Sequence, residues 1–356
     1  MSKTISYQEQ QKIQQTLKLR ELLVSLPNYV RQFFRGKETS TSNRTKIAYA
    51  YDLNIFFHYL KEHKPELSSI EIKDISLDIL NSLDIFDIEE YQDYLKIYAS
   101  PTTGIQHTNN ERGIARKLSA LRSFFSYLYK RGLITNDPTT LLEMPKIHDK
   151  AIVQLEHQEV VHLLEYMEHC AEDLTFRQRV SYEKTKIRDI ALMTLMLGTG
   201  IRVSECVGLD ITDVDMNQCS IRIIRKGGNE MVVYFGEDVK NALENYLEQR
   251  KDVIACEGHE QALFLSIRKK RICVDAVADL VKKYTSKITK NKVITPHKLR
   301  STYGTLLYEE TGDIYLVADV LGHKNVNTTR KHYAAIKENR RRRAADAVSL
   351  KNTNII

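Results

Sequence analysis

The sequence predicts a mainly helical protein of two domains, with a small β-hairpin in the second domain. Apolar residues recur every three to four positions in most segments, as they do in amphipathic helices. One stretch, residues 219–235, instead alternates apolar and polar residues around Gly227-Gly228, which is typical of a hairpin. A proline-containing stretch of mixed charge without helical period, residues 144–154, separates the two halves as a linker. A chain of 356 residues can build a core in each domain.

The composition is that of an ordinary globular protein, with 42% hydrophobic and 28% charged residues. The chain has no apolar run of about 18 residues and no cleavable signal pattern at Met1, so we expect neither a membrane span nor secretion, and a cytoplasmic location. The five cysteines are scattered and include no C-x-x-C pair. This favours reduced and mostly buried thiols over a disulfide framework or a zinc site.

The net charge is +7, and both halves of the chain share the excess. Lys and Arg outnumber Asp and Glu by 21 to 18 in residues 1–150, and by 32 to 28 in the remainder. A moderate, evenly shared excess suits a protein that holds DNA with both domains, but many enzymes that never touch DNA have it too. Charge alone therefore does not decide the function.

The first half of the chain should be helical throughout. Residues 1–42 are polar and glutamine-rich, with apolar positions that predict one or two helices before a loop. A helix should begin at Ser42 or Asn43, and helical regions should follow at 84–98 and 114–130, within a domain of residues 43–143. Several basic residues are expected at the solvent face of these helices: Arg44, Lys46, Arg116, Lys117 and Arg122. They either contact DNA or are merely solvated, because charge runs commonly are.

The second domain, residues 155–356, should place helices around the hairpin. Helices are expected at 156–167, 182–197, 238–250 and 274–288, and from Pro296 onward, where proline suits the first turn. Gly198 and Gly200 should break the second of these helices and leave Arg202 just past a tight turn. A basic loop is a further candidate for phosphate contacts, with Lys269, Lys270 and Arg271.

His297 and Arg300 lie three positions apart on the helix that follows Pro296, so they can address a single anion. A guanidinium stays charged and matches two phosphate oxygens, and we therefore expect that anion to be a phosphate. A phenol with a pKa of about 10 is a poor nucleophile unless cations favour its anion, which gives Tyr333 a chemical role beside them. Each residue alone is more often surface or packing, so the argument depends on the order of the motifs.

Four boxes occur in a fixed order along the second half of the chain. They are T-G-I-R-V-S-E at Thr199–Glu205, H-K-L-R at His297–Arg300, L-G-H at Leu321–His323, and Tyr333. In this order they resemble the boxes of tyrosine recombinases, the phage integrase family, and the resemblance covers nearly the whole chain. It implies a two-domain clamp on DNA, made of a helical SAM-like core-binding domain and a mixed α/β catalytic domain that ends in an interaction tail.

The resemblance implies the chemistry of site-specific recombination, in which DNA strands are cut and rejoined. Arg202 and Arg300 would hold the scissile phosphate and stabilise its transition state. Tyr333 would attack it and leave a 3′-phosphotyrosyl bond. Lys226, in the hairpin, would protonate the departing 5′ oxygen. No cofactor is implied, neither a metal ion nor ATP.

The remaining motif residues would assist this chemistry. His297 would act in proton transfer, His323 would donate a hydrogen bond to the phosphate, and Glu205 would support the first arginine or His297. The hairpin departs from the family pattern at two positions. Arg225 stands where a glycine is usual, and Glu230 stands where a second basic residue is common.

Within the family, the boxes and the long polar N-terminus most resemble the single-protein Xer branch, which resolves chromosome dimers at a dif-like DNA site before cell division. This implies double-stranded DNA, a homotetramer on two DNA sites and the division protein FtsK as partners. A phage or conjugative-transposon integrase has the same chemistry and is the main alternative. Such integrases often begin with a small β-rich module, whereas residues 1–42 are expected to be helical.

Three other classes of protein fit less well. An architectural DNA-binding protein with a dead site conflicts with six filled catalytic positions. A type IB topoisomerase shares the chemistry, but it relaxes supercoils as a monomer and does not need paired sites. A metal-dependent nuclease would need carboxylates clustered at ligand spacing, and none occur near these boxes.

Overall fold

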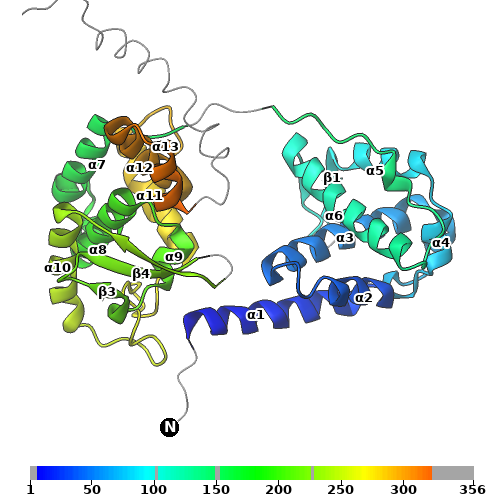
Figure 1. Ribbon diagram of the computed structural model, residues 1–356, viewed down its shortest axis with the longest axis horizontal. Helices are drawn as coiled ribbons and strands as arrows, with labels where there is room; N and C mark the ends of the chain where they lie inside the picture. The colour runs from blue at the N-terminus through cyan, green and yellow to red at the C-terminus, as the bar shows by residue number, and fades with distance from the viewer. Residues whose placement is uncertain (1–5, 101–102, 149–152, 226–227, 323–356) are drawn as a thin grey trace, which may run out of the picture. The chain divides into compact units, whose positions relative to one another are not determined.

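The computed structural model describes residues 6–100, 103–148, 153–225 and 228–322. The chain divides into two compact units, Met1–Lys150 and Ala151–Ile356, which are described separately (Figure 1). Both are mainly helical, and the second contains the predicted hairpin, so the expected fold class is confirmed. In the part of the chain that the structure describes, no helix is both long and apolar enough to cross a bilayer.

Helices make up most of the first unit. They are α1 (Tyr7–Leu22), α2 (Asn28–Gly36), α3 (Asn43–His63), α4 (Leu77–Asn81), α5 (Ile85–Tyr94) and α6 (Glu111–Lys130). Side chains cap four of them in the way short polar residues do at helix starts. Ser42 Oγ accepts a hydrogen bond from Thr45 N at the start of α3, and Ser6, Asp84 and Asn110 cap α1, α5 and α6. The predicted start of α3 is confirmed.

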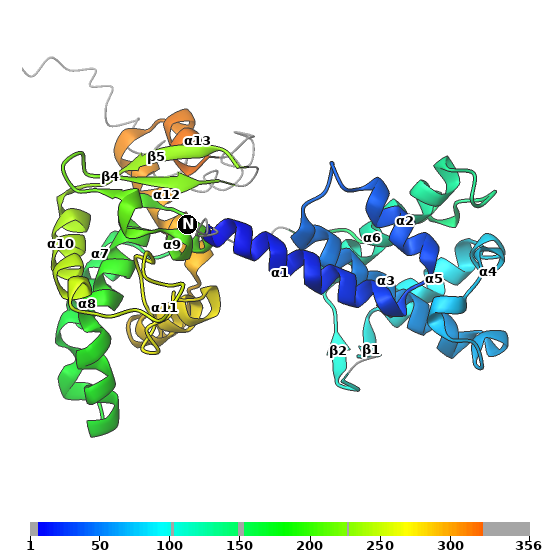
Figure 2. The ribbon, with the colours of Figure 1, turned by 90° about the horizontal axis from the view of Figure 1, so that it is seen from below.

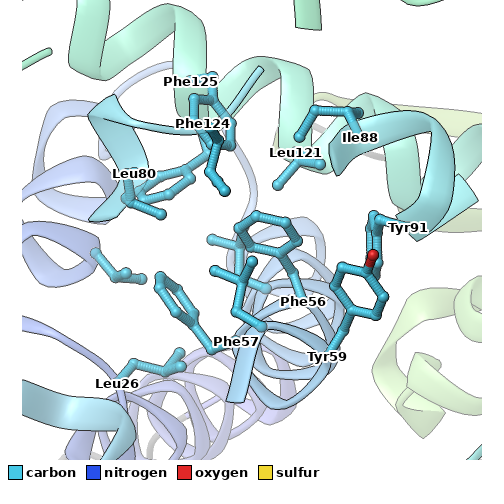
Figure 3. Packing of buried hydrophobic residues seen from close by; sticks show 14 of the residues in the cluster. Leu26, Phe56, Phe57, Tyr59, Leu80, Ile88, Tyr91, Leu121, Phe124 and Phe125 are labelled. Carbon is cyan, nitrogen blue, oxygen red and sulfur yellow. The ribbon is translucent and has the colours of Figure 1, made fainter. Parts of the chain in front are cut away.

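An aromatic core holds the first unit together (Figure 3). Phe56 meets Tyr91 nearly edge to face, with ring centroids 5.1 Å apart, and Phe33 meets Phe124 in the same way at 5.4 Å. Such pairs add to the stabilisation that burial of the rings already gives. Phe33 comes from α2 and is fully buried. Residues of the expected N-terminal extension, 1–42, thus pack into the same core as α3 and α6.

A second hairpin replaces part of the helix and loop that the sequence predicts in the first unit. The predicted helix at 84–98 ends at Tyr94, and strands β1 (Ile97–Ala99) and β2 (Gln106–Thr108) pair antiparallel (Figure 2). Asn109 explains the change, because its Nδ2 donates to the Leu95 carbonyl at 2.7 Å and closes the end of α5. The expectation of an all-helical first domain is therefore wrong in this detail.

In the second unit, helices surround a central helix, α8. The helices are α7 (His157–His169), α8 (Phe176–Thr199), α9 (Val203–Gly208), α10 (Glu237–Lys251), α11 (Val274–Ile288), α12 (Pro296–Thr311) and α13 (Ile314–Leu321). α8 packs against α7, α10 and α12. Three antiparallel strands, β3 (Val214–Asp215), β4 (Ser220–Ile224) and β5 (Glu230–Tyr234), form a sheet in the order β3-β4-β5. Ile221 pairs with Val233, and both are buried on one face of this sheet.

The end of α8 differs in one respect from the prediction. Gly198 does not break the helix but lies inside it, at a close contact with Val239 of α10 where a Cβ would overlap the valine side chain. Gly200 alone ends α8, as a left-handed C-cap with a φ of +62°. α9 begins three residues after Gly200, and Arg202 is its N-cap residue.

The five cysteines are all free thiols. Cys170 and Cys206 are buried, whereas Cys219 and Cys256 are half-buried and Cys273 is exposed. The expectation of mostly buried thiols thus holds for two of the five. Burial raises the pKa of the Cys206 thiol to about 12, and Glu205 beside it adds to this effect.

Candidate active site

Three of the four motif boxes meet where α8 and α13 end and where α9 and α12 begin. Arg202, Glu205, His297 and Arg300 belong to the described part of the chain. The other three predicted site residues, Lys226, His323 and Tyr333, lie outside the described residues.

Arg300 joins the boxes to one another. Its side chain is buried, with an exposed fraction of 4%. Nη1 donates to the Gly200 carbonyl at 2.6 Å, and Nη2 donates to the Leu321 carbonyl. Both acceptors are carbonyls at helix ends, which carry partial negative charge and suit a cation. One guanidinium therefore connects the residues that precede Arg202 and His323 in the sequence.

Close packing around Gly200 keeps the two helix ends together. A Cβ on Gly200 would overlap the Tyr303 ring of α12 and crowd the Leu321 side chain of α13. α13 is in turn held on α12 by a small apolar cluster that includes Tyr308, Val317 and Leu321. The position of Arg300 is thus fixed by packing as well as by hydrogen bonds.

Arg202 is oriented by Glu205, one turn further along α9. Arg202 Nη1 lies 2.8 Å from Glu205 Oε1, and the Arg202 backbone N donates to Glu205 Oε2 at 2.8 Å. The carboxylate is almost fully buried, whereas the Arg202 side chain keeps about a third of its surface exposed. The sequence offered Arg202 or His297 as the partner of Glu205, and the observed contact is with Arg202.

His297 lies in the first turn of α12, three residues before Arg300, and is exposed. The helix starts at the predicted proline, with Thr295 as its N-cap. His297 therefore faces solvent at the rim, while Arg300 lies in the interior one turn later.

Arg225 is a residue of this site that the motifs did not assign. Its Nη2 donates to the Val320 carbonyl of α13 at 2.6 Å, and its guanidinium lies against Gly322. Figure 2 shows the hairpin of β4 and β5 beside α13. Burial lowers the pKa of the Arg225 guanidinium, with Glu205 and Arg202 close enough to act on it in opposite directions. The only sequence signal was that Arg225 replaces a glycine usual at this position.

The arrangement suits an anion. The hydrogen bonds from Arg225 to Val320 and from Arg300 to Gly200 and Leu321 end on backbone carbonyls, which orient a guanidinium without cancelling its charge. Fixed cations in a partly buried site stabilise negative charge far better than they do in water. Among the described residues, no three His, Cys, Asp or Glu side chains are grouped so that they could hold a metal ion.

The structure moves some predicted DNA contacts of the first unit away from solvent. Arg44 is exposed on α3, as expected, but Lys46 is 1% exposed and its Nζ lies 2.7 Å from Glu38 Oε2. The reason is α1, which packs across the start of α3 and is tied to it by Asn43 Nδ2 and Thr16 Oγ1 at 3.0 Å. The predicted surface position of Lys46 is wrong.

On α6 the three predicted contacts differ from one another. Arg116 is half exposed and makes two hydrogen bonds, of 2.5 and 2.8 Å, to the buried carboxylate of Asp52. Lys117 is buried, with its Nζ 2.9 Å from Asn109 Oδ1. Arg122 is half-buried and donates to the carbonyls of Thr139 and Leu142, which ties down the chain after α6. The prediction that Lys117 and Arg122 lie on the outside is wrong.

In the basic loop of the second unit, Lys269 and Lys270 are exposed. Arg271 is instead half-buried, forms an ion pair with Asp210, and donates to the Leu209 carbonyl at 2.7 Å. Lys269 has a φ of +58°, so it sits at the tip of a tight turn. Of the three predicted contacts in this loop, only the two lysines project into solvent.

Two family models match the chain. The model described as the phage integrase family matches residues 154–340, more than half of the sequence. The model described as the phage integrase N-terminal SAM-like domain matches residues 30–132. The two matches fall in the second and the first unit, respectively.

Similar proteins are named as tyrosine recombinases. XerC of Caldanaerobacter subterraneus subsp. tengcongensis is 33% identical over 331 residues, which cover 88% of this chain and 86% of that protein. XerS of Lactococcus lactis subsp. cremoris is 29% identical, over 92% of this chain and 97% of that protein.

Solved structures with the same fold include recombinases bound to DNA. XerH in a post-cleavage complex with palindromic difH substrate has a TM-score of 0.61 at 19% identity, over 96% of this chain and 97% of that one. The Tn1549 transposon integrase with circular intermediate DNA has a TM-score of 0.60 at 18% identity, over 86% and 95%. The two-domain architecture expected from the resemblance is confirmed.

Proposed function

The chain belongs to the phage integrase family of tyrosine recombinases and is a site-specific DNA recombinase, and on that premise we propose that it recombines dif-like sites to resolve chromosome dimers before cell division. Relatives named XerC, XerD and XerS support a Xer-type role. XerH, which has the same fold, was solved on its difH substrate.

The observation that carries the proposed chemistry is the pair of bonds from Arg300 to the Gly200 and Leu321 carbonyls. These bonds bring together boxes that lie about a hundred residues apart in the sequence, and the side chain that makes them is positively charged. Arg202, held by Glu205, adds a second, partly exposed cation. Two oriented arginines can bind the non-bridging oxygens of one phosphodiester and stabilise the extra charge of its transition state.

In the proposed reaction, the Tyr333 oxygen forms a bond to phosphorus while the bond from phosphorus to O5′ breaks. The phenolic proton passes to His297, and Lys226 gives a proton to O5′, so that a free 5′-hydroxyl leaves. His323 donates a hydrogen bond to the phosphate. The phosphotyrosyl bond retains the energy of the broken bond, and the 5′-hydroxyl of a second strand can attack it without ATP.

The proposed partners are double-stranded DNA carrying a dif-like site, three further copies of the chain on two DNA sites, and FtsK as the activating protein. The place of action would be the cytoplasm, where that DNA lies. Exposed basic residues in both units, such as Arg44, Lys269 and Lys270, would contact phosphates and make the affinity depend on salt.

A mobile-element integrase is the second candidate, because the Tn1549 integrase has nearly the same TM-score as XerH. The N-terminal segment favours the Xer role. Residues 7–36 form two helices that pack into the core of the first unit, unlike the separate β-rich module that many integrases carry there.

Trapping of the covalent intermediate tests the chemistry. The chain would be incubated in EDTA with a nicked suicide DNA that carries a candidate dif-like site, alongside Tyr333→Phe. We expect a protein-DNA adduct from the wild type only, since the phenylalanine variant lacks the nucleophile. DNA binding without an adduct from either protein would overturn the proposed chemistry.

Recombination of paired sites tests the biological role. Two plasmid-borne copies of the dif-like site would be offered with and without FtsK, and a pair of non-identical attachment sites from a mobile element would serve as the comparison. Exchange between the identical sites supports chromosome dimer resolution. Exchange only between the attachment sites would establish the integrase instead.

A further inference from the structure

Arg225 connects the hairpin to α13 across 95 positions of sequence. It follows the last residue of β4, and its backbone closes the turn: Arg225 N donates to the Asn229 carbonyl at 2.8 Å, and its carbonyl accepts from Gly228 N at 3.0 Å. The backbone of Arg225 is thus fixed to the hairpin, while its side chain reaches a different element.

The Arg225 guanidinium packs closely against the C-terminal end of α13. Nη2 donates to the Val320 carbonyl at 2.6 Å, and the next carbonyl along, that of Leu321, accepts from Arg300. Gly322 caps α13 with a φ of +62°, and a Cβ there would overlap Nη1 of Arg225. The two arginines therefore bind adjacent carbonyls at the end of one helix, and a glycine leaves room for the first.

The burial of this side chain is energetically unfavourable and needs an explanation. Arg225 Nε is buried and has no hydrogen-bond partner among the described residues. A buried donor without a partner costs folding energy, and native structures rarely keep one without a reason. Burial also lowers the pKa of the guanidinium, so the protein holds a cation where solvent would stabilise it better.

We propose that Arg225 is a positioning residue for Lys226, its neighbour in the sequence: it ties the end of β4 to the C-terminal end of α13, and so to the phosphate-binding arginines. This rests on the proposed function, in which Lys226 protonates the leaving oxygen. A lysine has a long flexible stem, and a proton donor must lie within hydrogen-bond reach of its acceptor. The link through Arg225 fixes the end of β4 on α13 before the reaction begins.

A direct role of Arg225 at the phosphate is the competing interpretation. The geometry favours the positioning role, because Nη2 holds the end of β4 on Val320 and Nε is withdrawn from solvent, and Arg225 belongs to none of the motif boxes. Contact with a phosphate would have to come from the N–H groups that the bond to Val320 leaves over. The two interpretations differ in what happens when the leaving group no longer needs a proton.

A substrate with sulfur in place of the bridging 5′ oxygen separates them. A thiol has a pKa of about 8.5, so a thiolate leaves without a proton donor, whereas an alkoxide does not. The rate of adduct formation would be measured on matched oxygen and sulfur suicide substrates for the wild type, Lys226→Ala, Arg225→Ala and Arg225→Met. The methionine variant keeps an apolar stem and lacks the donors, which guards against a failure of Arg225→Ala to fold.

We expect Arg225→Ala and Arg225→Met to cleave the oxygen substrate about 10- to 100-fold more slowly than the wild type, a fraction of the effect of losing a general acid. On the sulfur substrate both should come within about threefold of the wild type, as Lys226→Ala should. Arg222→Ala is the matched control. It removes an arginine of β4 that binds Asp213 at the surface, and both substrates should be cleaved at the normal rate.

The outcomes keep the two proposals apart. If the wild type forms no adduct on either substrate, the proposed function fails. If sulfur does not restore Lys226→Ala, the assignment of the proton donor fails. If sulfur restores Lys226→Ala but neither Arg225 variant, Arg225 does not act through Lys226, and the positioning role is overturned.

Discussion

The basic residues of the two units are alike in sequence but differ in what holds them. In the first unit, Lys46 pairs with Glu38 and Arg116 binds the buried carboxylate of Asp52 through both ends of its guanidinium. In the second unit, Arg225 donates to the Val320 carbonyl and Arg300 donates to two carbonyls at helix ends. A carboxylate offsets part of the charge of the arginine it holds, whereas a carbonyl only orients it.

This difference shows that the solvent exposure of a basic side chain does not by itself indicate whether it takes part in the reaction. Arg300 is 4% exposed and Arg116 is about half exposed, yet Arg300 lies among the motif boxes. A buried arginine held by carbonyls is a preorganised cation, which is what a transition state with excess negative charge requires. Arg116, bound to the buried Asp52 carboxylate outside the motif boxes, stabilises the fold instead. Arg202 is intermediate, since Glu205 orients it while about a third of its side chain stays exposed.

The largest effect is expected for Arg300→Ala, compared with Arg122→Ala. Both arginines donate to two backbone carbonyls, but Arg122 belongs to the first unit and binds those of Thr139 and Leu142. Arg300→Ala should slow adduct formation by about 10³-fold or more, since one lost donor to a developing oxyanion already costs about 10²- to 10³-fold. Arg122→Ala should leave the rate on saturating DNA unchanged and lower the free energy of unfolding by about 1–3 kcal/mol.

Suicide-substrate kinetics and urea unfolding of the same two preparations provide the measurements. A slow chemical step in Arg122→Ala at saturating DNA would contradict its purely structural role. A folded Arg300→Ala with the wild-type rate would contradict the role of Arg300 at the phosphate.

The carboxylates give the next largest effect, through Glu205→Gln compared with Asp52→Asn. Glu205 Oε1 and Oε2 fix both the side chain and the backbone of Arg202, and the amide can replace only part of this. We expect adduct formation to slow by about tenfold, as for other groups that orient a catalytic residue. Asp52→Asn should leave that rate unchanged on bound DNA and should lower stability.

Stopped time courses at saturating DNA, with a thermal melt of each variant, measure both quantities. An unchanged rate for Glu205→Gln would show that Arg202 does not need its carboxylate. The assignment of Asp52 to the fold would be contradicted by a slow chemical step in a variant that melts normally.

A smaller effect is expected for DNA affinity, with Arg44→Ala and Lys46→Met as a matched pair. The two residues lie two positions apart on α3, but Arg44 is exposed and Lys46 is buried against Glu38. If Arg44 contacts a phosphate, its loss should reduce the slope of log affinity against log salt by about one. Lys46→Met keeps the buried stem and should not change that slope.

Fluorescence anisotropy with labelled dif-like DNA at several salt concentrations provides the slopes. Equal slopes for Arg44→Ala and the wild type would remove Arg44 from the set of DNA contacts. A lower slope for Lys46→Met would mean that the ion pair between Lys46 and Glu38 opens when DNA binds.

Local features of the fold could be predicted from the sequence because local chemistry decides them. The helix at 274–288 has the predicted bounds, and Ser42 caps α3 as expected, since periodicity and capping act over a few residues. β1 and β2 were missed because each has only three residues, too few for an alternating pattern to stand out.

Features that depend on distant segments could not be predicted in this way. Lys46 was placed on the surface because the pattern of α3 does not show that α1 covers its first turn. Arg225 was visible as a departure from a family box, but its partner Val320 lies 95 positions away. Arg202, His297 and Arg300 were predicted as site residues because their types and order form a motif, whereas the contact between Arg202 and Glu205 is seen only in the structure.

The smallest effect is expected for Arg222→Ala, which removes an arginine of β4 three positions before Arg225. Arg222 Nη2 lies 2.9 Å from Asp213 Oδ1, and more than half of the arginine side chain is exposed. An exposed ion pair contributes at most about 1 kcal/mol, because water screens it and two long side chains must be ordered. We expect a change of that size in urea unfolding and no change in adduct formation. A large loss of activity would mean that any arginine of the hairpin matters for the reaction. The different roles assigned to Arg222, which binds a carboxylate, and Arg225, which binds a carbonyl, would then be wrong.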